Sequence, residues 1–318
     1  MVVRGASLHT EPGLPANFIS FRFYELAGNS IRVFPVTTTI ARMNDPYAVI
    51  GNPIAHSKSP QIHLAFAQQT SQTVVYTRMF CEIGAFAHTV QAFRTAGGKG
   101  LNITLPFKHE AFALATQRTP RAELAGAVNV LTFTADGIMG DNTDGAGLVR
   151  DITVNLDCTL RGKKMLLLGA GGASFGVVGP LLGELPGVLV IANRTVSKAA
   201  VLAQRFSNSV MHCEISASTY AALAGKNFDV VINATSAGLS GSMPELPANL
   251  FAPGALAYDM VYGKTTPFMQ FAQAHGALGI RVAGGLGMLV EQAAESFFIW
   301  RGVRPLTAPV MAAMRDQD

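Results

Sequence analysis

Short apolar runs alternate with longer, helix-like patterns along most of the chain. Most runs show little polar alternation, which is typical of strands that are buried on both faces of a parallel sheet. They occupy residues 47–50, 74–80, 100–104, 165–168, 188–192, 229–233, 255–260 and 280–282. Between them apolar residues recur at helical spacing, as at Phe86, Val90 and Phe93. The pattern predicts an α/β fold in which strands and helices follow one another.

End signals help to place several of the other elements. Ser59 and Pro60 predict a helix start, with Ser59 as N-cap and Pro60 at the first helical position. A hairpin is predicted about Asp136-Gly137, because this dipeptide separates two apolar runs. Further helices are expected near Lys108, over 144–156, after the glycines near 172, over 267–275, over 286–300 and after 305.

Two α/β domains are expected, because 318 residues exceed the comfortable size of one core. Residues 1–42 keep no helical or alternating period and lack the pattern of a secretory signal, so we expect a loose N-terminal extension. Residues 43–143 form the first domain, and residues 144–284 form a Rossmann-like second domain. The helix predicted over 286–300 has no strand after it. We therefore expect 285–318 to return to the first domain, which makes that domain discontinuous and leaves a cleft between the two.

The stretch Lys164-Met-Leu-Leu-Leu-Gly-Ala-Gly-Gly-Ala-Ser-Phe-Gly176 joins an apolar strand to a glycine-rich turn and a helix. Gly169 permits a tight turn, and Gly171 lets the backbone approach a pyrophosphate. A helix beginning near Gly172 offers free N–H groups to the anion. Ser174 stands where a third glycine or an alanine is usual. The alternative is a glycine-rich turn without a ligand, and the residues after the next strand favour a dinucleotide.

That next strand, over residues 188–192, ends without the Asp or Glu that usually binds the ribose hydroxyls of NAD. Asn193, Arg194, Thr195 and Lys198 follow it instead. The guanidinium, hydroxyl and ammonium groups at this distance from the glycines suit a 2′-phosphate. An Arg after a strand is more often a solvated surface residue. The three side chains together favour NADP over NAD.

The amino-acid composition of the chain favours some classes of binding partner over others. Hydrophobic residues make up 49% of the chain and charged residues 14%, as in a well-buried globular protein. The net charge of +4 is spread without blocks of Lys and Arg, which disfavours nucleic acid and suits small anions. Cys81, Cys158 and Cys213 lack metal spacing, so we expect reduced thiols of a cytoplasmic protein and no metal site. The uncharged stretch 165–183 contains six glycines and Pro180, which argues against a membrane span.

Polar loops follow the strand ends of the first domain, where a substrate bound between domains would meet them. Ser57 and Ser59 offer two hydroxyl donors, which suits the two oxygens of a carboxylate. Capping a helix is the competing role for Ser59. Lys108 and Asp144 are the acid–base pair of these loops that suits ketone reduction. Each alone is more often a surface charge, so the hypothesis requires that they converge.

Seven motifs occur in order along the chain. They are Gly51-Asn-Pro-Ile-Ala-His-Ser-Lys-Ser-Pro60, Asn102-Ile-Thr-Leu-Pro-Phe-Lys108, Gly126-Ala-Val-Asn129, Gly140-Asp-Asn-Thr-Asp-Gly145, Asn193-Arg-Thr195, Asn233-Ala-Thr-Ser236 and Gly285-Leu-Gly-Met-Leu289. Together they closely resemble the shikimate dehydrogenase family over about residues 47–310. The resemblance implies the NADPH-dependent, reversible reduction of 3-dehydroshikimate to shikimate in aromatic amino-acid biosynthesis.

Two other functions are alternatives to the NADPH-dependent reduction. A quinate/shikimate dehydrogenase that uses NAD is disfavoured, because no acid stands at Arg194 and Thr195. A non-catalytic NADP-binding sensor is disfavoured, because Lys108 and Asp144 are both present.

The resemblance also implies a role for each matching residue. Lys108 and Asp144 would form the catalytic pair. The substrate would be bound through its carboxylate by Ser57, Ser59 and Tyr262, and through its ring hydroxyls by Asn102, Thr104, Asn129 and Gln292. The NADP-binding residues would be Gly169, Gly171, Gly172, Ala173, Asn193, Arg194, Thr195 and Lys198, with Met260 and Gly285 near the nicotinamide.

The chain departs from the family pattern at two positions. Phe175 stands where many members have Arg, which removes one cation beside the glycine turn, and Gly284 replaces a frequent Asp. The expected partners are the small-molecule substrate and, in a homodimer, a second copy of the chain. No nucleic-acid or membrane partner is expected.

Overall fold

The structure, a computed structural model, describes residues 5–9, 18–27, 30–39, 45–207, 212–275 and 279–315. The chain divides into two compact units, Met1–Asp45 and Pro46–Asp318. In the first unit β1 (Gly5–His9), β2 (Phe18–Ala27) and β3 (Ser30–Thr39) form an antiparallel sheet in that order. The sequence predicted no regular element here, because Gly, Pro, Ser and Thr interrupt the apolar pattern. The pairing of Phe23 opposite Phe34 is a cross-strand feature that no period within one strand reveals.

The first sheet of the larger unit has six strands in the order β5-β4-β6-β8-β9-β7. Its strands are β4 (Asp45–Gly51), β5 (Val74–Phe80), β6 (Gly100–Ile103), β7 (Gln117–Arg118), β8 (Val130–Thr134) and β9 (Gly137–Asp141). β4 and β6 are parallel, whereas the pairs β6–β8 and β8–β9 are antiparallel. The hairpin predicted about Asp136-Gly137 is confirmed, since Gly137 has a φ of 144° and begins β9.

The second sheet has the order β12-β11-β10-β13-β14-β15, and every pair of neighbours is parallel. Its strands are β10 (Lys164–Leu168), β11 (Val188–Ala192), β12 (Glu214–Ser218), β13 (Phe228–Asn233), β14 (Phe251–Asp259) and β15 (Arg281–Gly284). This is the strand order of a doubly wound dinucleotide-binding fold. The glycine-rich turn follows β10, where the strand order reverses, which is where such sheets bind ligands.

Most of the predicted helices are confirmed. The helices are α1 (Ser59–Gln69), α2 (Phe86–Thr95), α3 (Lys108–Leu114), α4 (Pro120–Ala125), α5 (Asp144–Arg150), α6 (Gly172–Gly183), α7 (Val196–Ser207), α8 (Pro267–Gln273), α9 (Leu286–Arg301) and α10 (Ala308–Arg315). A π-helical turn, Asp151–Asn155, continues α5. The sequence had not predicted α4, α7, β7 or β12. The uncharged stretch 165–183 is β10, the turn and α6, and no helix among the described residues is long and apolar enough to cross a membrane.

The predicted N-cap role of Ser59 is wrong. Helix α1 begins at Ser59 itself, and Lys58 occupies the N-cap position without a capping side-chain bond. Ser57 lies within a turn closed by its own N–H and the Ile54 carbonyl at 3.1 Å, and its Oγ accepts from the Ser59 backbone N–H at 3.3 Å. The serine two residues earlier therefore reaches the helix start, and the Ser59 hydroxyl is not needed as a cap.

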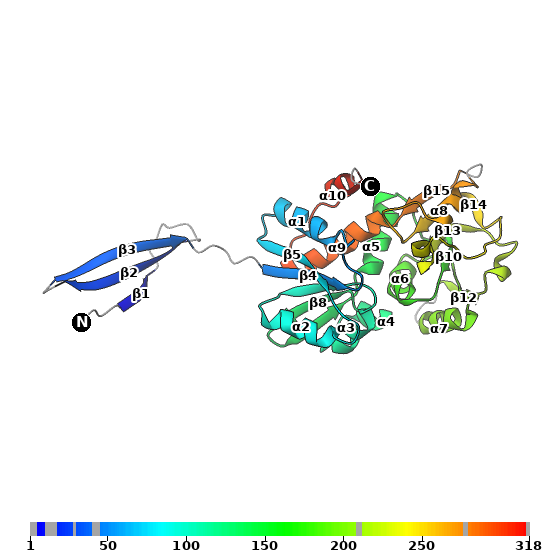
Figure 1. Cartoon of the computed structure of the whole chain (residues 1–318). Coiled ribbons are helices and arrows are strands. Elements are labelled where there is room, and N and C mark those ends of the chain that lie inside the picture. Colours follow the sequence, from blue (N-terminus) through cyan, green and yellow to red (C-terminus); the bar gives the residue numbers. More distant parts are fainter. Residues whose placement is uncertain are drawn as a thin grey trace. The chain divides into compact units, whose positions relative to one another are not determined.

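Helix α9 joins the two sheets (Figure 1). It begins directly after β15 and packs along α5, and its apolar side contacts α1 and α10. The core at this contact contains Ile62, Phe66, Val290, Phe297 and Val310. The chain therefore returns to the first sheet after β15. We propose the domain division at residues 143–144 and 284–285, because α5 begins at one of these points and β15 ends at the other.

Candidate active site

Lys108 and Asp144 form an ion pair between two helix starts. Lys108 is the first residue of α3 and Asp144 the first residue of α5. Lys108 Nζ donates to Asp144 Oδ2 at 2.6 Å, and the two side chains are 21% and 11% exposed. Both are shielded enough for a charge-assisted hydrogen bond to hold their geometry, and open enough to meet a ligand. The structure thus brings together the pair that the catalytic hypothesis requires.

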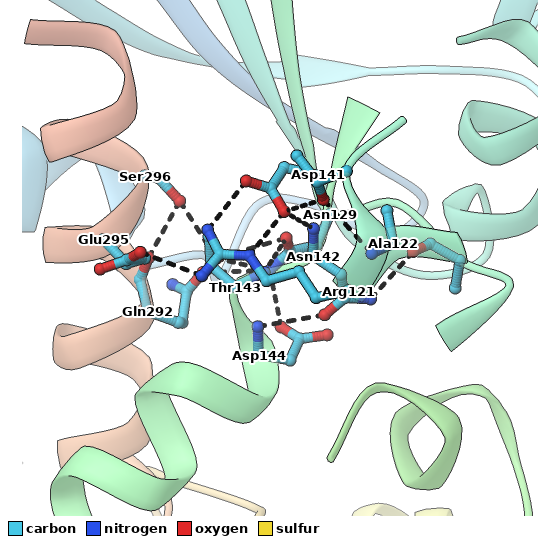
Figure 2. A network of polar contacts seen from close by, with 12 residues as sticks. Arg121, Ala122, Asn129, Asp141, Asn142, Thr143, Asp144, Gln292, Glu295 and Ser296 are labelled. Atoms are coloured by element: carbon cyan, nitrogen blue, oxygen red, sulfur yellow. Dashed lines mark hydrogen bonds and ion pairs between the residues drawn. The ribbon is translucent and has the colours of Figure 1, made fainter. Parts of the chain in front are cut away.

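Asn129 fixes the other oxygen of Asp144 (Figure 2). Its Nδ2 donates to Asp144 Oδ1 at 2.8 Å, and its Oδ1 accepts from the Thr143 backbone N–H at 2.8 Å. Gln292 of α9 lies against the same group, with its Oε1 3.4 Å from both Thr143 Oγ1 and Asn129 Nδ2. The predicted residues Asn129 and Gln292 therefore meet beside the ion pair, although they are far apart in the sequence.

Asn102 extends this network towards the two serines. It is buried at the end of β6, and its Nδ2 donates to Ser296 Oγ at 3.0 Å. Its Oδ1 accepts from the Tyr76 hydroxyl at 2.6 Å. Burial raises the pKa of Tyr76 well above its usual value, and a hydrogen bond with Ser59 opposes part of that rise.

Ser57 Oγ donates to Ser59 Oγ at 3.2 Å, and Ser296 Oγ lies 3.3 Å from Thr143 Oγ1. Hydrogen bonds thus form a chain that begins at Ser57 and ends at Lys108. Its members are Ser57, Ser59, Tyr76, Asn102, Ser296, Thr143, Asn129, Asp144 and Lys108. We call it the polar chain.

Tyr76, Thr143 and Ser296 are members of the polar chain that the sequence did not single out. Ser296 follows Gln292 by four residues on α9, so both project from one face of the helix. Thr143 directly precedes Asp144, and Tyr76 is the buried aromatic residue of a strand that continues with Thr77 and Arg78. These were the available signals, and each was weak. Thr104 lies in the turn between β6 and α3, where its carbonyl accepts from the Phe107 N–H at 3.1 Å.

A charged cluster supports the loop that carries Asp144 (Figure 2). Arg121 of α4 donates to both oxygens of Asp141, at 2.6 Å and 2.8 Å, and to Glu295 of α9 at 3.0 Å. Arg304 donates to the other Glu295 oxygen at 2.6 Å. Burial alone would raise the pKa of Glu295, but hydrogen bonds from Arg304 and Arg121 outweigh it and lower that pKa. This cluster ties the end of β9 to α9, and the sequence did not predict it.

The glycine-rich turn fits a dinucleotide. Gly169 has a φ of 107°, which only glycine adopts readily, and Gly171 has open space where a Cβ would stand. Helix α6 begins at Gly172, so its free N–H groups face the end of β10. The departure at Ser174 has a structural reason, because its hydroxyl donates to the Gly169 carbonyl at 2.9 Å and closes the turn.

A cavity of about 220 Å³ lies beside this turn. Its lining consists of Ala170, Phe175, Ser197, Lys198 and Val201. Arg194 and Thr195 are exposed in the loop after β11, where Asn193 Nδ2 donates to the Thr195 carbonyl at 2.9 Å. Lys198 and this loop place cationic and hydroxyl groups beside the cavity, and their role at the 2′-phosphate of NADP remains a prediction. Phe175 contributes an apolar wall, with the Arg205 guanidinium 5.8 Å from its ring.

The residues predicted near the nicotinamide lie at the ends of β14 and β15. The Gly285 N–H donates to the Val261 carbonyl at 3.0 Å, and a Cβ on Gly285 would collide with the Met260 carbonyl. Asp259 holds this turn, since it accepts from the Val261 N–H at 2.9 Å. Tyr262 and Gly284 line a second cavity of about 300 Å³, and the carboxylate role of Tyr262 remains a prediction.

Within the described ranges no cluster of His, Cys, Asp and Glu could hold a metal ion. Cys81, Cys158 and Cys213 are free thiols.

Three family models match successive parts of the chain. Residues 49–131 match the shikimate dehydrogenase substrate binding domain, and residues 152–240 match shikimate / quinate 5-dehydrogenase. Residues 285–315 match the shikimate 5'-dehydrogenase C-terminal domain.

The chain matches nearly the whole length of its curated relatives. The shikimate dehydrogenase (NADP(+)) of Dechloromonas aromatica is 57% identical over 274 residues, which are 86% of this chain and 98% of the relative. The enzyme of that name from Alkalilimnicola ehrlichii is 56% identical over 276 residues, 86% of this chain and 100% of the relative.

Two solved structures share the fold. An Ael1 enzyme from Pseudomonas putida is 48% identical with a TM-score of 0.78, and the match covers 85% of this chain and 98% of that one. Shikimate 5-dehydrogenase from Thermus thermophilus in complex with NADP(H) and shikimate is 30% identical with a TM-score of 0.75. The match covers 86% of this chain and 99% of that one. These matches, together with the doubly wound sheet and the Lys108–Asp144 pair, assign the chain to the shikimate dehydrogenase family.

Proposed function

We propose that the chain is an NADP-dependent shikimate dehydrogenase, which reduces the ketone of 3-dehydroshikimate to the alcohol of shikimate and runs in both directions. The observation that carries this proposal is the Lys108–Asp144 ion pair at 2.6 Å, with Asn129 on the second carboxylate oxygen. Relatives that carry this enzyme name, at 56–57% identity, support the same reaction and cofactor. The NAD-dependent alternative is not favoured.

Lys108 is proposed as the group that meets the developing charge. When bound, NADPH would supply a hydride to the carbonyl carbon, so that negative charge would develop on the carbonyl oxygen. An ammonium group within hydrogen-bond reach stabilises this oxygen and can transfer a proton to it. Asp144 holds the ammonium in place. Because Asn129 and the start of α5 fix Asp144 in turn, the pair needs little reorganisation during the reaction.

The substrate is proposed to lie along the polar chain. Ser57 and Ser59 at one end have the hydroxyl donors for its carboxylate, and Lys108 with Asp144 at the other end faces the reacting oxygen. Asn102, Thr104, Asn129 and Gln292 are assigned to the ring hydroxyls between the ends. The match of residues 49–131 to a substrate binding domain supports substrate binding in this part of the chain.

NADP is proposed to bind the second sheet. Gly169, Gly171, Gly172 and Ala173 would receive the pyrophosphate at the start of α6. Asn193, Arg194, Thr195 and Lys198 would surround the 2′-phosphate, and Met260 and Gly285 would lie near the nicotinamide. The open space at Gly171 and the cavity beside Lys198 support this placement.

Initial rates with shikimate and with quinate, each with NADP and with NAD, test the proposal. The expected result is fast reduction of NADP with shikimate and slow rates in the other three combinations. Fast turnover of quinate with NAD would instead assign the quinate dehydrogenase. Tight NADP binding without turnover of either substrate would assign the sensor.

The location and assembly of the enzyme are also proposals. The three free thiols support a cytoplasmic location. A homodimer is proposed from the sequence, and light scattering on the purified protein would measure its mass.

A further inference from the structure

His63 is a buried polar side chain whose hydrogen-bonding needs are not met. It lies on α1, is 1% exposed, and neither ring nitrogen has a hydrogen-bond partner. Burial lowers the pKa of the imidazole from 6.5 to about 3, so the ring is neutral and carries one N–H donor and one acceptor nitrogen. Buried polar groups in native proteins are nearly always hydrogen-bonded, because leaving them unpaired is costly. The two unmet groups therefore require an explanation.

Aromatic rings hold His63 in one orientation. Its ring stacks on Tyr76, with 4.2 Å between centroids and 5° between planes. Trp300 lies at 5.4 Å, and Phe66 and Phe297 each lie at 6.2 Å. An apolar residue would fill this place without leaving polar atoms unpaired. Packing alone therefore does not explain why an imidazole, and not an apolar side chain, occupies this place.

The neighbours of His63 belong to the proposed substrate pocket. His63 follows Ser59 by four residues, so the two side chains project from one face of α1. Tyr76, which stacks on His63, donates to Asn102 Oδ1. Asn102 also makes a weak, poorly aligned polar contact with His63, short of a full hydrogen bond, which opposes part of the fall in the imidazole pKa. The Asn102 amide oxygen has two lone pairs, and the Tyr76 hydroxyl takes one of them.

We infer that His63 is a positioning residue of the substrate pocket, whose ring N–H donates to Asn102 Oδ1 once a substrate hydroxyl binds the Asn102 amide. In the free protein Asn102 Nδ2 donates to Ser296. A ring hydroxyl that takes over this bond shifts the amide slightly, and the second lone pair of its oxygen then meets the fixed imidazole while the Tyr76 hydroxyl keeps the first. This hydrogen bond is well aligned only in the bound state, so it favours that state. The inference rests on the proposed function, because Asn102 is assigned there to a ring hydroxyl.

A His63→Phe variant tests this role. It keeps an aromatic ring in the stack and removes both nitrogens. The KM for shikimate is expected to rise about tenfold, the scale of one hydrogen bond lost from the bound state, while kcat changes less than about threefold. The Kd for NADP, measured by direct titration, is expected to stay the same. The melting temperature is expected to be equal or higher, because two unpaired polar atoms are removed from the interior.

Two further variants sharpen the result. His63→Gln retains an N–H donor and is expected to recover part of the affinity. His275→Phe is the matched control. The His275 ring also packs among aromatic rings, with its centroid 4.8 Å from that of Phe271 and 5.7 Å from that of Phe251. His275 comes directly after α8, which belongs to the part of the chain that forms the second sheet. It is expected to leave the KM for shikimate unchanged. A wild-type KM in His63→Phe, with normal shikimate oxidation by the unaltered protein, overturns the inference and leaves the proposed function intact.

A spectroscopic measurement decides the matter even where a variant fails to fold. In the unaltered protein with ¹⁵N-labelled histidine, the N–H resonance of His63 is expected to shift when shikimate is added. The carbon-bound protons of the His63 ring keep the same aromatic neighbours, so their resonances are expected to shift less. A His63 signal that stays unchanged at saturating shikimate overturns the inference. A protein that neither binds nor oxidises shikimate refutes the proposed function first.

Discussion

Burial of His63 is expected to make the fold sensitive to mild acid. The pKa of the imidazole is about 3 in the folded protein and 6.5 in the unfolded chain. Below pH 6.5 the unfolded chain gains a proton that the folded protein does not accept. The neutral, buried His63 therefore costs the fold no stability above pH 6.5. Below that pH the free energy of unfolding decreases steadily as pH falls towards 3. Since one pH unit corresponds to about 1.4 kcal/mol for one proton, the loss between pH 7 and pH 5 is about 2 kcal/mol.

Urea unfolding of the unaltered protein and of His63→Phe at pH 7, 6 and 5 measures this loss. Other titrating groups are the same in both proteins, so they largely cancel in the difference between the two free energies of unfolding. Asp151, whose pKa is raised by burial, is one such group. The variant is expected to gain about 2 kcal/mol relative to the unaltered protein between pH 7 and pH 5. Parallel curves would refute the reasoning and show that His63 is protonated in the folded state.

Three other substitutions address the chemistry and the fold. Lys108→Ala is expected to lower kcat about a hundredfold or more and to change shikimate affinity far less; near-normal kcat with lost shikimate binding would make Lys108 a substrate anchor. Arg194→Ala is expected to raise the KM for NADP more than that for NAD, and an equal effect on both would contradict the 2′-phosphate role. Gly287→Ala is expected to lower the free energy of unfolding by about 1–3 kcal/mol, because its Cβ would collide with the Asp151 carboxylate. A wild-type denaturation midpoint would show that Asp151 moves aside.

The apolar runs allowed most of both sheets to be predicted. Strands such as β10 and β13 are buried on both faces and therefore contain little polar alternation. The edge strand β12 was missed because it is only half-buried and its sequence, Glu-Ile-Ser-Ala-Ser, carries little apolar signal. Helix α7 was missed because Ala199 and Ala203 supply much of its buried face, and alanine marks a helix face weakly.

Members of the site could be predicted where they stand in a polar loop or a family motif, but their mutual contacts could not. Lys108 and Asp144 each stand at a helix start after a polar loop, which singled them out, but their convergence was a requirement of the hypothesis and not a result of the sequence pattern. Tyr76 and Ser296 could not be paired with Asn102 in this way. Their contact requires the packing of α9 against the first sheet, and no local pattern specifies which face of α9 meets which strand. Arg121 was missed for the same reason, since its partners Asp141 and Glu295 come from distant segments.

The polar chain constrains how this enzyme can evolve. Each buried member satisfies a neighbour, so a single replacement leaves that neighbour unpaired, whereas a matched double replacement does not. The free-energy effects of substitutions along the chain are therefore expected to be strongly non-additive. A change at Asn102 is tolerated only on a background already altered at Tyr76 or Ser296. Such epistasis makes the order of mutations matter, and it predicts that residues along the chain change together in related enzymes rather than one at a time.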